Sequence, residues 1–87
     1  MTKEEIEEFL DEAVGRDAKE IWLPDGFERA FIGASIDPPR AIYSIDTCIK
    51  ILVRQGISPD AAEEHFWINV AGTYLGDGSP LFIYALT

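Results

Sequence analysis

The chain is poor in the residues that build disulfides, metal sites and catalytic sets. Its 87 residues include one cysteine, Cys48, and one histidine, His65. A single cysteine excludes an internal disulfide and fits a reducing compartment. Zinc needs three or four Cys, His or carboxylate ligands, so we expect no metal and no cofactor.

Long apolar runs are also missing, and the first residues do not predict a leader sequence. No apolar run approaches the roughly 20 residues that span a membrane. The segment Met1-Thr2-Lys3-Glu4-Glu5 is acidic from its start, unlike a secretory signal. These features predict a cytoplasmic protein that does not bind membranes.

Positive charge is scarce throughout and missing from the last third. Asp and Glu number 16 against seven Lys and Arg, which gives a net charge of −9. Residues 1–20 hold eight acids and three bases, and residues 55–87 hold four acids and no base. Because each phosphate contact needs a cation, this distribution argues against direct nucleic-acid binding. It favours a protein partner, with a charge surplus that only keeps the protein soluble as the plain alternative.

Recognised catalytic motifs are not found either. Gly72, Gly76 and Gly78 occur without the GK[ST] of a phosphate loop or the G-x-G-x-x-G of a dinucleotide site. Nothing in the sequence pairs His65 with Cys48, as nucleophilic catalysis would require. We therefore expect no enzyme, and we interpret Cys48 as a small core residue.

An acidic amphipathic helix is predicted over residues 2–15. Thr2 and Glu5 have the spacing of a capping box, and Gly15 is suited to end the helix. The apolar stripe has helical spacing and consists of Ile6, Phe9, Leu10, Ala13 and Val14. Three acids lie opposite this stripe and should face water: Glu4, Glu8 and Asp11.

Two strands are predicted in the middle of the chain. Pro24-Asp25-Gly26 indicates a turn, because Pro fixes φ and Gly allows a positive φ. Residues 31–36 predict a first strand, with a helical turn near residues 27–31 as an alternative. Residues 40–45 alternate in polarity and predict a second strand. Asp37-Pro38-Pro39 separates the two, so they can pair as a hairpin.

Two helices and a final strand are predicted in the second half. Asp46 is a suitable N-cap for a helix that ends at Gln55 and Gly56. Ser58 and Pro59 predict the start of the last helix, and Gly72 should end it. The helical wheel puts these residues on its core side: Ala61, Ala62, His65, Phe66 and Asn69. Residues 73–75 are predicted as a short extended piece, residues 76–78 as a turn and residues 80–86 as a strand.

The fold class is therefore α+β, with the order α-β-β-α-α-β. We expect a small antiparallel sheet of two or three short strands with three helices packed on it. Residues 1–87 should form a single domain, in which the acidic helix over residues 2–15 precedes a compact body over residues 21–87.

The candidate partner-binding residues are acids at the two ends of the chain together with one tryptophan. They are Glu4, Glu8, Asp11, Asp60, Glu63, Glu64 and Trp67. A tryptophan rimmed by acids is typical of a protein-binding hot spot. The alternative is that another element covers Trp67, and that the acids serve only the positive end of the helix dipole. Trp22 is expected to cover the core rather than to anchor a partner.

Residues 23–82 carry a pattern that resembles a family of small uncharacterised proteins of bacteria and their phages. The matching residues are Asp25-Gly26-Phe27, Ile32-Gly33, Ala41-Ile42-Tyr43, Asp46, Cys48-Ile49, Ile51-Leu52, Gly56-Ile57-Ser58, Ala61-Ala62-Glu63-Glu64, Phe66 and the tail Asn69-Val70-x-Gly72-x-Tyr74-x-Gly76-x-x-x-Pro80-x-Phe82. The resemblance implies a phage or prophage origin. It implies no activity for this chain, because no activity is established for the family. Physically, Asn69 could bond the backbone of the following turn, while Tyr74 and Phe82 fold over the helix.

Three functions are compatible with these observations. The first is a small acidic module that binds and inhibits or regulates a host protein, in one version by mimicking nucleic acid. The second is a homo-oligomeric structural domain that uses Trp22, Trp67 or an exposed strand edge. The third is an enzyme or a small-ligand binder with His65, Tyr43 and Tyr74 around a pocket.

Overall fold

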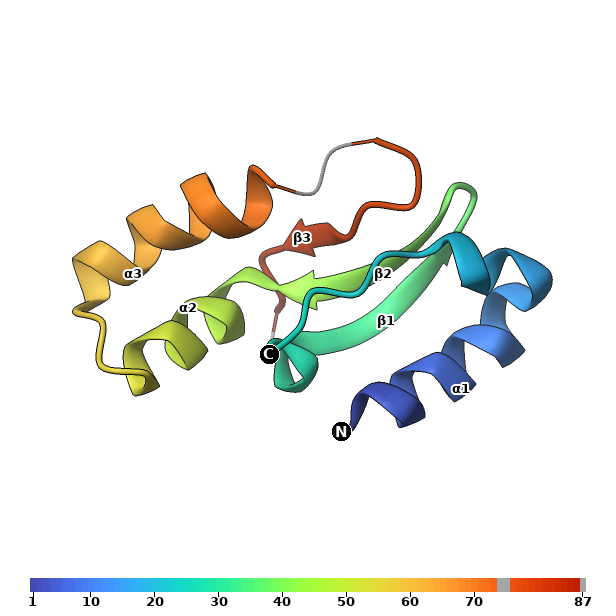
Figure 1. Ribbon diagram of the computed structural model, residues 1–87, viewed down its shortest axis with the longest axis horizontal. Coiled ribbons are helices and arrows are strands. Elements are labelled where there is room, and N and C mark those ends of the chain that lie inside the picture. Colours follow the sequence, from blue (N-terminus) through green and yellow to red (C-terminus); the bar gives the residue numbers. More distant parts are fainter. Residues whose placement is uncertain (74–75, 87) are drawn as a thin grey trace.

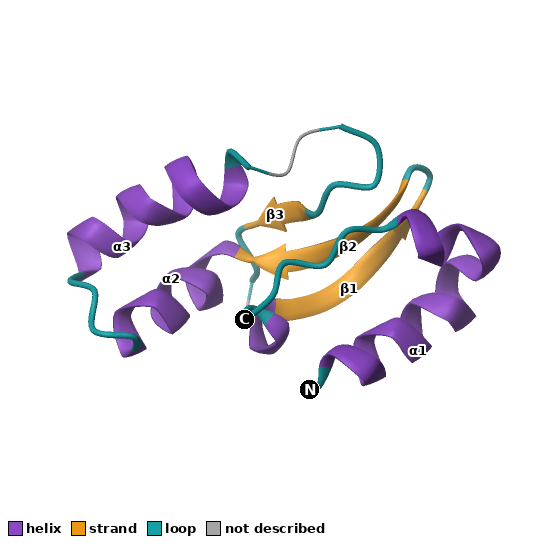
Figure 2. Cartoon of the chain, in the orientation of Figure 1, coloured by secondary structure: helices purple, strands orange, loops and turns teal. Residues whose placement is uncertain are grey.

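The computed structural model describes residues 1–73 and 76–86 and has the predicted α+β architecture (Figure 1). The order α-β-β-α-α-β is confirmed. In chain order, the elements are α1 (Lys3–Val14), η1 (Gly15–Glu20), η2 (Glu28–Ala30), β1 (Phe31–Ile36), β2 (Pro39–Ser44), α2 (Ile45–Arg54), α3 (Pro59–His65), η3 (Phe66–Ala71) and β3 (Leu81–Ile83). Figure 2 shows the sheet between α1 at one end of the molecule and α2 and α3 at the other.

The sheet is mixed rather than wholly antiparallel. β1 and β2 form the predicted hairpin, with Ala34 opposite Ala41 and a bulge at Ile32, between Phe31 and Gly33. The peptide between Asp37 and Pro38 in its turn is cis. β3 pairs parallel to β2, which corrects the prediction of an antiparallel sheet. The reason is the connection: the two helices of residues 45–71 return the chain to the end of the sheet where β2 began, and such a crossover joins parallel strands.

The first helix is built as its sequence predicts. The Thr2 hydroxyl accepts a hydrogen bond from the Glu5 backbone at 3.2 Å, and Glu5 Oε1 accepts one from the Thr2 backbone at 2.9 Å. The bond from the Thr2 backbone, together with the Thr2 side chain, favours the ionised carboxylate and lowers the pKa of Glu5. Gly15 ends the helix with a φ of 68°. Ile6 and Leu10 are buried, whereas Ala13 is exposed, so the covered stripe is narrower than predicted.

The second helix begins at a different cap from the predicted one. Ser44, the last residue of β2, accepts a hydrogen bond from the backbone of Thr47 at 3.3 Å through its hydroxyl. The strand therefore runs directly into α2. Asp46, predicted as the cap, lies in the first turn, where its charge still suits the helix dipole.

The third helix has the predicted start and end but a different buried face. Ser58 caps it and Pro59 opens it. From Phe66 the winding changes to a π-helix, in which the Gly72 N–H bonds the Trp67 carbonyl at 3.1 Å. The buried residues are Ala62, Phe66 and Val70, one every four positions.

Three residues predicted for the core side of this helix are exposed: Ala61, His65 and Asn69. The helical wheel predicts a broad apolar face, but α2 and β3 cover only a stripe one residue wide. Within the described part of the following turn, the Asn69 side chain makes no hydrogen bond; its Nδ2 lies 3.3 Å from Nδ1 of His65. The Asn69 carbonyl instead accepts a hydrogen bond from the Thr73 hydroxyl at 2.6 Å.

Six aromatic rings form a continuous series across the sheet, which we call the aromatic series. In spatial order they are Phe9, Phe31, Tyr43, Phe82, Phe66 and Trp67, with neighbouring ring centroids 5.0–6.0 Å apart. The series starts on α1, crosses β1, β2 and β3, and ends on η3. Tyr43 and Phe66 are fully buried, and both end rings are partly exposed. The predicted packing of Phe82 over the last helix is thereby confirmed.

The loop before β3 is held by close contact between its backbone at Gly78 and the backbone of residues 20–22. Residues 76–78 form the predicted turn, and the Trp22 N–H donates a hydrogen bond to the Gly78 carbonyl at 2.9 Å. Gly78 has a φ of 79°, and a Cβ on it would overlap the carbonyl oxygen of Glu20. The strand that follows covers residues 81–83 rather than 80–86. Of the extended piece predicted at residues 73–75, Thr73 is in a turn, and residues 74–75, with Tyr74, lie outside the described residues.

We expect Gly78→Ala to destabilise the fold more than Gly76→Ala. Gly76 also has a positive φ, 108°, but open space where a Cβ would point. Both variants should lose about 1–2 kcal/mol from the strained φ. Gly78→Ala should lose about 1–3 kcal/mol more from steric overlap. Urea unfolding followed by tryptophan fluorescence measures both, and equal losses would contradict the close backbone approach.

The aromatic series predicts that replacing Phe by Leu destabilises the fold more at the middle of the series than at its end. Among the described rings, Phe66 contacts two and is fully buried, whereas Phe9 contacts one and is partly exposed. Since a ring pair adds about 0.5–1.5 kcal/mol beyond its buried area, Phe66→Leu should cost about 2–3 kcal/mol and Phe9→Leu about 1 kcal/mol or less. Chemical unfolding tests this, and a larger loss at Phe9 would disprove it.

Candidate functional site

The predicted binding acids lie in two separate places. Glu4, Glu8 and Asp11 are exposed on α1, and Asp60, Glu63 and Glu64 are exposed on α3. The two helices lie at opposite ends of the molecule (Figure 1). The fold therefore does not bring the seven predicted residues together on one surface.

A groove between α2 and α3 gathers part of the second acidic set. Its volume is about 370 Å³. α3 contributes Asp60 and Glu63, and the facing side of α2 contributes Asp46 and Lys50. Tyr84, exposed just after β3, lines it as well. We call this site the acidic groove.

Unneutralised charge is the main chemical property of the acidic groove. Three carboxylates and one ammonium line it, so its lining has a net charge of −2. Among the described side chains, the one ion pair joins Lys3 Nζ to Asp25 Oδ1 at 3.0 Å. Neither residue lines the groove. The hydrogen bond between Lys3 and Asp25 raises the pKa of Lys3. The groove can therefore attract a cationic group, such as a Lys or Arg side chain.

Three of the charged and aromatic groove residues, Asp46, Lys50 and Tyr84, were not predicted as site residues from the sequence. Asp46 was interpreted as a helix cap, which explained its charge without a site. Its spacing to Lys50, i to i+4, puts both on one face of α2 and was the available signal. Nothing in the sequence indicated that Tyr84 would reach the same place, because the path of the chain after β3 depends on the parallel pairing.

Trp67 is exposed rather than covered by another element, and it lies one helical turn beyond Glu63 of the acidic groove. Its exposed fraction is 43%, and that of the next residue, Ile68, is 62%. Glu63 and Glu64 precede Trp67 by four and three positions, so all three share one side of the helix. The Trp67 and Phe66 rings form a T-shaped pair, with centroids 5.0 Å apart and an interplanar angle of 77°. Trp67 thus contacts the core through Phe66 and still has exposed surface.

Trp22 differs from its prediction as a core cover. Its exposed fraction is 52%. The segment that carries it is held by the backbone bond to Gly78 and by its buried neighbour Ile21. The Trp22 side chain therefore lies at the surface. In the sequence, it is not adjacent to the predicted acids of α1 or to those of α3.

The residues considered for catalysis or for a ligand pocket do not come together. His65 is exposed, whereas Tyr43, a residue of β2, is fully buried. Tyr74, the third residue of that predicted pocket, lies outside the described residues. Cys48 is fully buried, as predicted, and desolvation raises the pKa of its thiol to about 12. In the part of the chain that the structure describes, no group of three or more His, Cys, Asp or Glu side chains is placed to hold a metal ion.

Comparison with protein-family models, curated proteins and solved structures finds no match to this chain. The resemblance to small phage-borne proteins therefore stays a prediction, and function has to be argued from geometry. Within the described residues, none of the helices has the length and apolar character needed to cross a membrane.

The raised pKa of Cys48 predicts an unreactive thiol. A shift from 9.0 to about 12 lowers the thiolate fraction at pH 8 about a thousandfold. Ellman's reagent should therefore label Cys48 at the rate of unfolding in buffer and at once in urea. Rapid labelling of the folded protein would contradict the burial.

The same shift predicts how stability depends on pH. Above the ordinary thiol pKa of 9.0, the unfolded chain loses the Cys48 proton while the folded chain keeps it. The free energy of unfolding should therefore fall as pH rises from about 9 toward 12. Cys48→Ala is the control, because the fall that remains in this variant comes from other groups.

Proposed function

We propose that this protein is a small interaction module that binds a basic segment of a partner protein in the acidic groove and beside Trp67. The observation that carries the proposal is the juxtaposition of an unneutralised groove with an exposed aromatic side chain. Carboxylates from two helices, Asp46 on α2 with Asp60 and Glu63 on α3, line one hollow. The protein acts in this proposal by binding and not by catalysis.

A protein partner fits these features better than an isolated cation. Tyr84 lines the groove with exposed ring surface, and Trp67 is exposed one helical turn beyond Glu63. A Lys or Arg side chain can pack on such a ring while its charge meets the carboxylates. Interface hot spots are enriched in tryptophan and tyrosine that are held in place by their own fold. The T-shaped contact of Trp67 with Phe66 provides that support.

The mode of action that we propose is inhibition or regulation of a cytoplasmic host protein by a phage- or prophage-related product. A bound module covers a basic surface and so blocks its other contacts. The separation of the α1 acids from the acidic groove favours a partner with a short basic segment over one with an extended nucleic-acid groove. Nucleic-acid mimicry along the whole molecule is therefore the weaker version of the proposal.

A homo-oligomer is the second candidate, supported by exposed apolar residues on and beside the sheet. Ile36, at the end of edge strand β1, has an exposed fraction of 74%, and Ile32 and Leu81 are also exposed. Uncovered apolar residues at a sheet edge favour association. Sedimentation at increasing concentration separates this candidate from the first, since a monomer at all concentrations would exclude it.

The proposed function predicts a site-specific and salt-dependent loss of binding. The groove variant combines Asp60→Asn with Glu63→Gln, and the matched control combines Glu4→Gln with Glu8→Gln on α1. Both remove two negative charges. Proteins captured from host lysate and identified by mass spectrometry are then titrated with each variant. We expect about a tenfold or larger loss for the groove variant and less than about twofold for the control.

Two further results distinguish specific binding from general attraction of charge. Affinity should fall between about 0.05 and about 0.5 M salt, because the contacts are ionic and near the surface. Trp67→Ala should weaken binding at both salt concentrations, since its contact is not ionic. Equal losses in the groove variant and the α1 control, or an affinity that is flat with salt, would count against the proposal.

A further inference from the structure

The sheet uses one of its two faces for the core. Side chains alternate between the faces along a strand, and the register of the three strands shows which residues share a face. The residues on the core side, which we call the inner face, are Phe31, Ala34, Ala41, Tyr43 and Phe82. α1 packs on this face through Phe9, and η3 packs on it through Phe66. The acidic helices therefore lie on the inner side of the sheet.

The opposite face, which we call the outer face, is also apolar at its centre. Its apolar residues come from all three strands and are Ile32, Ile42, Leu81 and Ile83. None of these four side chains belongs to the buried core. The exposed fraction is 48% for Ile32 and 39% for Leu81.

This composition is unusual for a sheet face in contact with water. An antiparallel sheet that is covered on one side carries polar residues on the other, and parallel strand pairs are covered on both sides. Here the parallel pair of β2 and β3 has Ile42 beside Leu81 on the outer face. Both the pairing and the residue types indicate that another surface covers this face.

Charge favours a second copy of the chain as that surface. Of the residues in β1, β2 and β3, Arg40 alone is charged, although the chain has 16 acids. Contact through the outer faces keeps the sheet and the core between the acidic helices of the two copies. Each layer adds about 10 Å, more than the roughly 8 Å over which charges act at physiological salt. Two copies, each with a net charge of −9, can therefore meet here with little repulsion.

The size of the outer face predicts a weak dimer. β1 and β2 have six residues each, so the face is about 20 Å long and, with three strands, about 14 Å wide. This footprint of about 300 Å² is well below the roughly 800 Å² that each partner buries in a standard interface. Interfaces at the low end of the range are transient, and we expect a dissociation constant on the order of 100 μM.

We propose that two copies of this protein associate through their outer faces, with Ile42 of each copy near the two-fold axis. Arg40 lies two residues from Ile42, so an antiparallel arrangement of the two β2 strands puts the two guanidinium groups at opposite ends of the contact. The helices that line the acidic groove lie on the outside of this dimer, which leaves both grooves open. The inference gives the homo-oligomer a defined surface and does not depend on binding in the acidic groove.

Sedimentation equilibrium of the full chain tests the proposal, at protein concentrations from about 10 μM to about 1 mM. We expect a monomer–dimer equilibrium whose affinity rises between about 0.05 and about 0.5 M salt, because salt screens the repulsion between two acidic copies. Binding of a basic segment in the acidic groove has the opposite salt dependence. A monomer at about 1 mM, which would leave the outer face to a different protein, or a dimer that weakens with salt overturns the proposal.

Three Ile→Lys variants show which surface makes the contact. Ile32→Lys should weaken the dimer by about tenfold or more, because an apolar contact cannot solvate the ammonium group. Ile68→Lys makes the same change on η3, where the side chain is 62% exposed, and should leave the dimer unchanged. Ile36→Lys changes the same strand as Ile32→Lys but the face of Ala34, and it should have less than about a third of the effect.

All three variants remove one net negative charge, so reduced repulsion alone would strengthen the dimer equally in each. Weakening by Ile36→Lys or by Ile68→Lys that equals the weakening by Ile32→Lys overturns the proposal. The first result would assign the contact to the β1 edge, and either result leaves the homo-oligomer candidate in place. Circular dichroism of each variant shows whether it is folded, so that a loss of association is not confused with unfolding.

Discussion

The aromatic series is the interaction on which the rest of the structure depends. Its six rings follow the spatial order of the elements, α1, β1, β2, β3 and η3, and so join parts of the chain that are far apart in sequence. Strands of three to six residues make few backbone bonds, and small sheets need an apolar face to be stable. Tyr43 and Phe82, opposite each other on the parallel pair β2 and β3, supply the centre of that face.

The same series explains why binding groups are available at the surface. In a domain of 87 residues, little area can be covered, so each helix buries a narrow stripe: Ile6 and Leu10 on α1, and Ala62, Phe66 and Val70 on α3 and η3. Both flanks of these stripes stay exposed. Trp67 is the outer ring of the series, so it contacts the core through Phe66 while its exposed surface and the acids beside it face outward.

Features that depend on neighbours in sequence were predictable, and features that depend on distant contacts were not. The Thr2 capping box, the Ser58-Pro59 helix start and the turn at Gly76 are local, and all three are confirmed. The parallel pairing of β3, the exposure of His65 and the π-helical winding depend on packing, which residue spacing does not report. Asp60 and Glu63 were found as candidates from charge alone, whereas their meeting with Asp46 required the α2–α3 contact.

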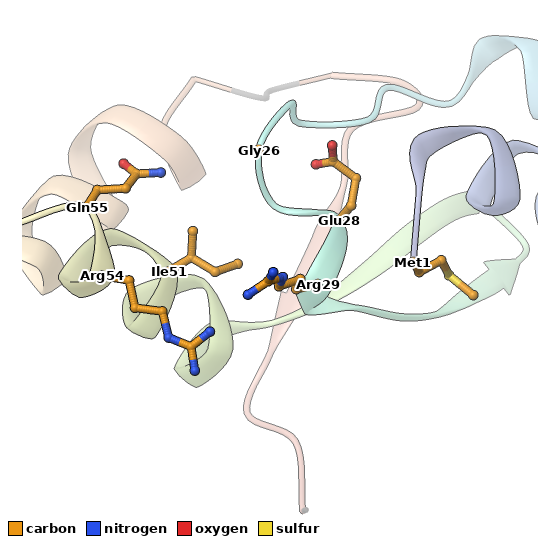
Figure 3. Close-up of a pocket in the computed structure, with 7 residues that line it drawn as sticks. All are labelled: Met1, Gly26, Glu28, Arg29, Ile51, Arg54 and Gln55. Carbon is orange, nitrogen blue, oxygen red and sulfur yellow. The ribbon is translucent and has the colours of Figure 1, made fainter.

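The charges along α2 show how a net charge can hide two hollows of opposite sign. Asp46 and Lys50 face α3, while Arg54 at the other end of the helix faces η2. An acid in the first turn and an arginine in the last turn of α2 suit the helix dipole. Because this local role accounts for both charges, the sequence alone gives no reason to assign either residue to a site. Arg29 and Arg54 line the same hollow only because η2 packs on α2 (Figure 3). A net charge of −9 therefore describes the long-range field of the molecule, and the chemistry of each hollow depends on which few side chains the helices bring together.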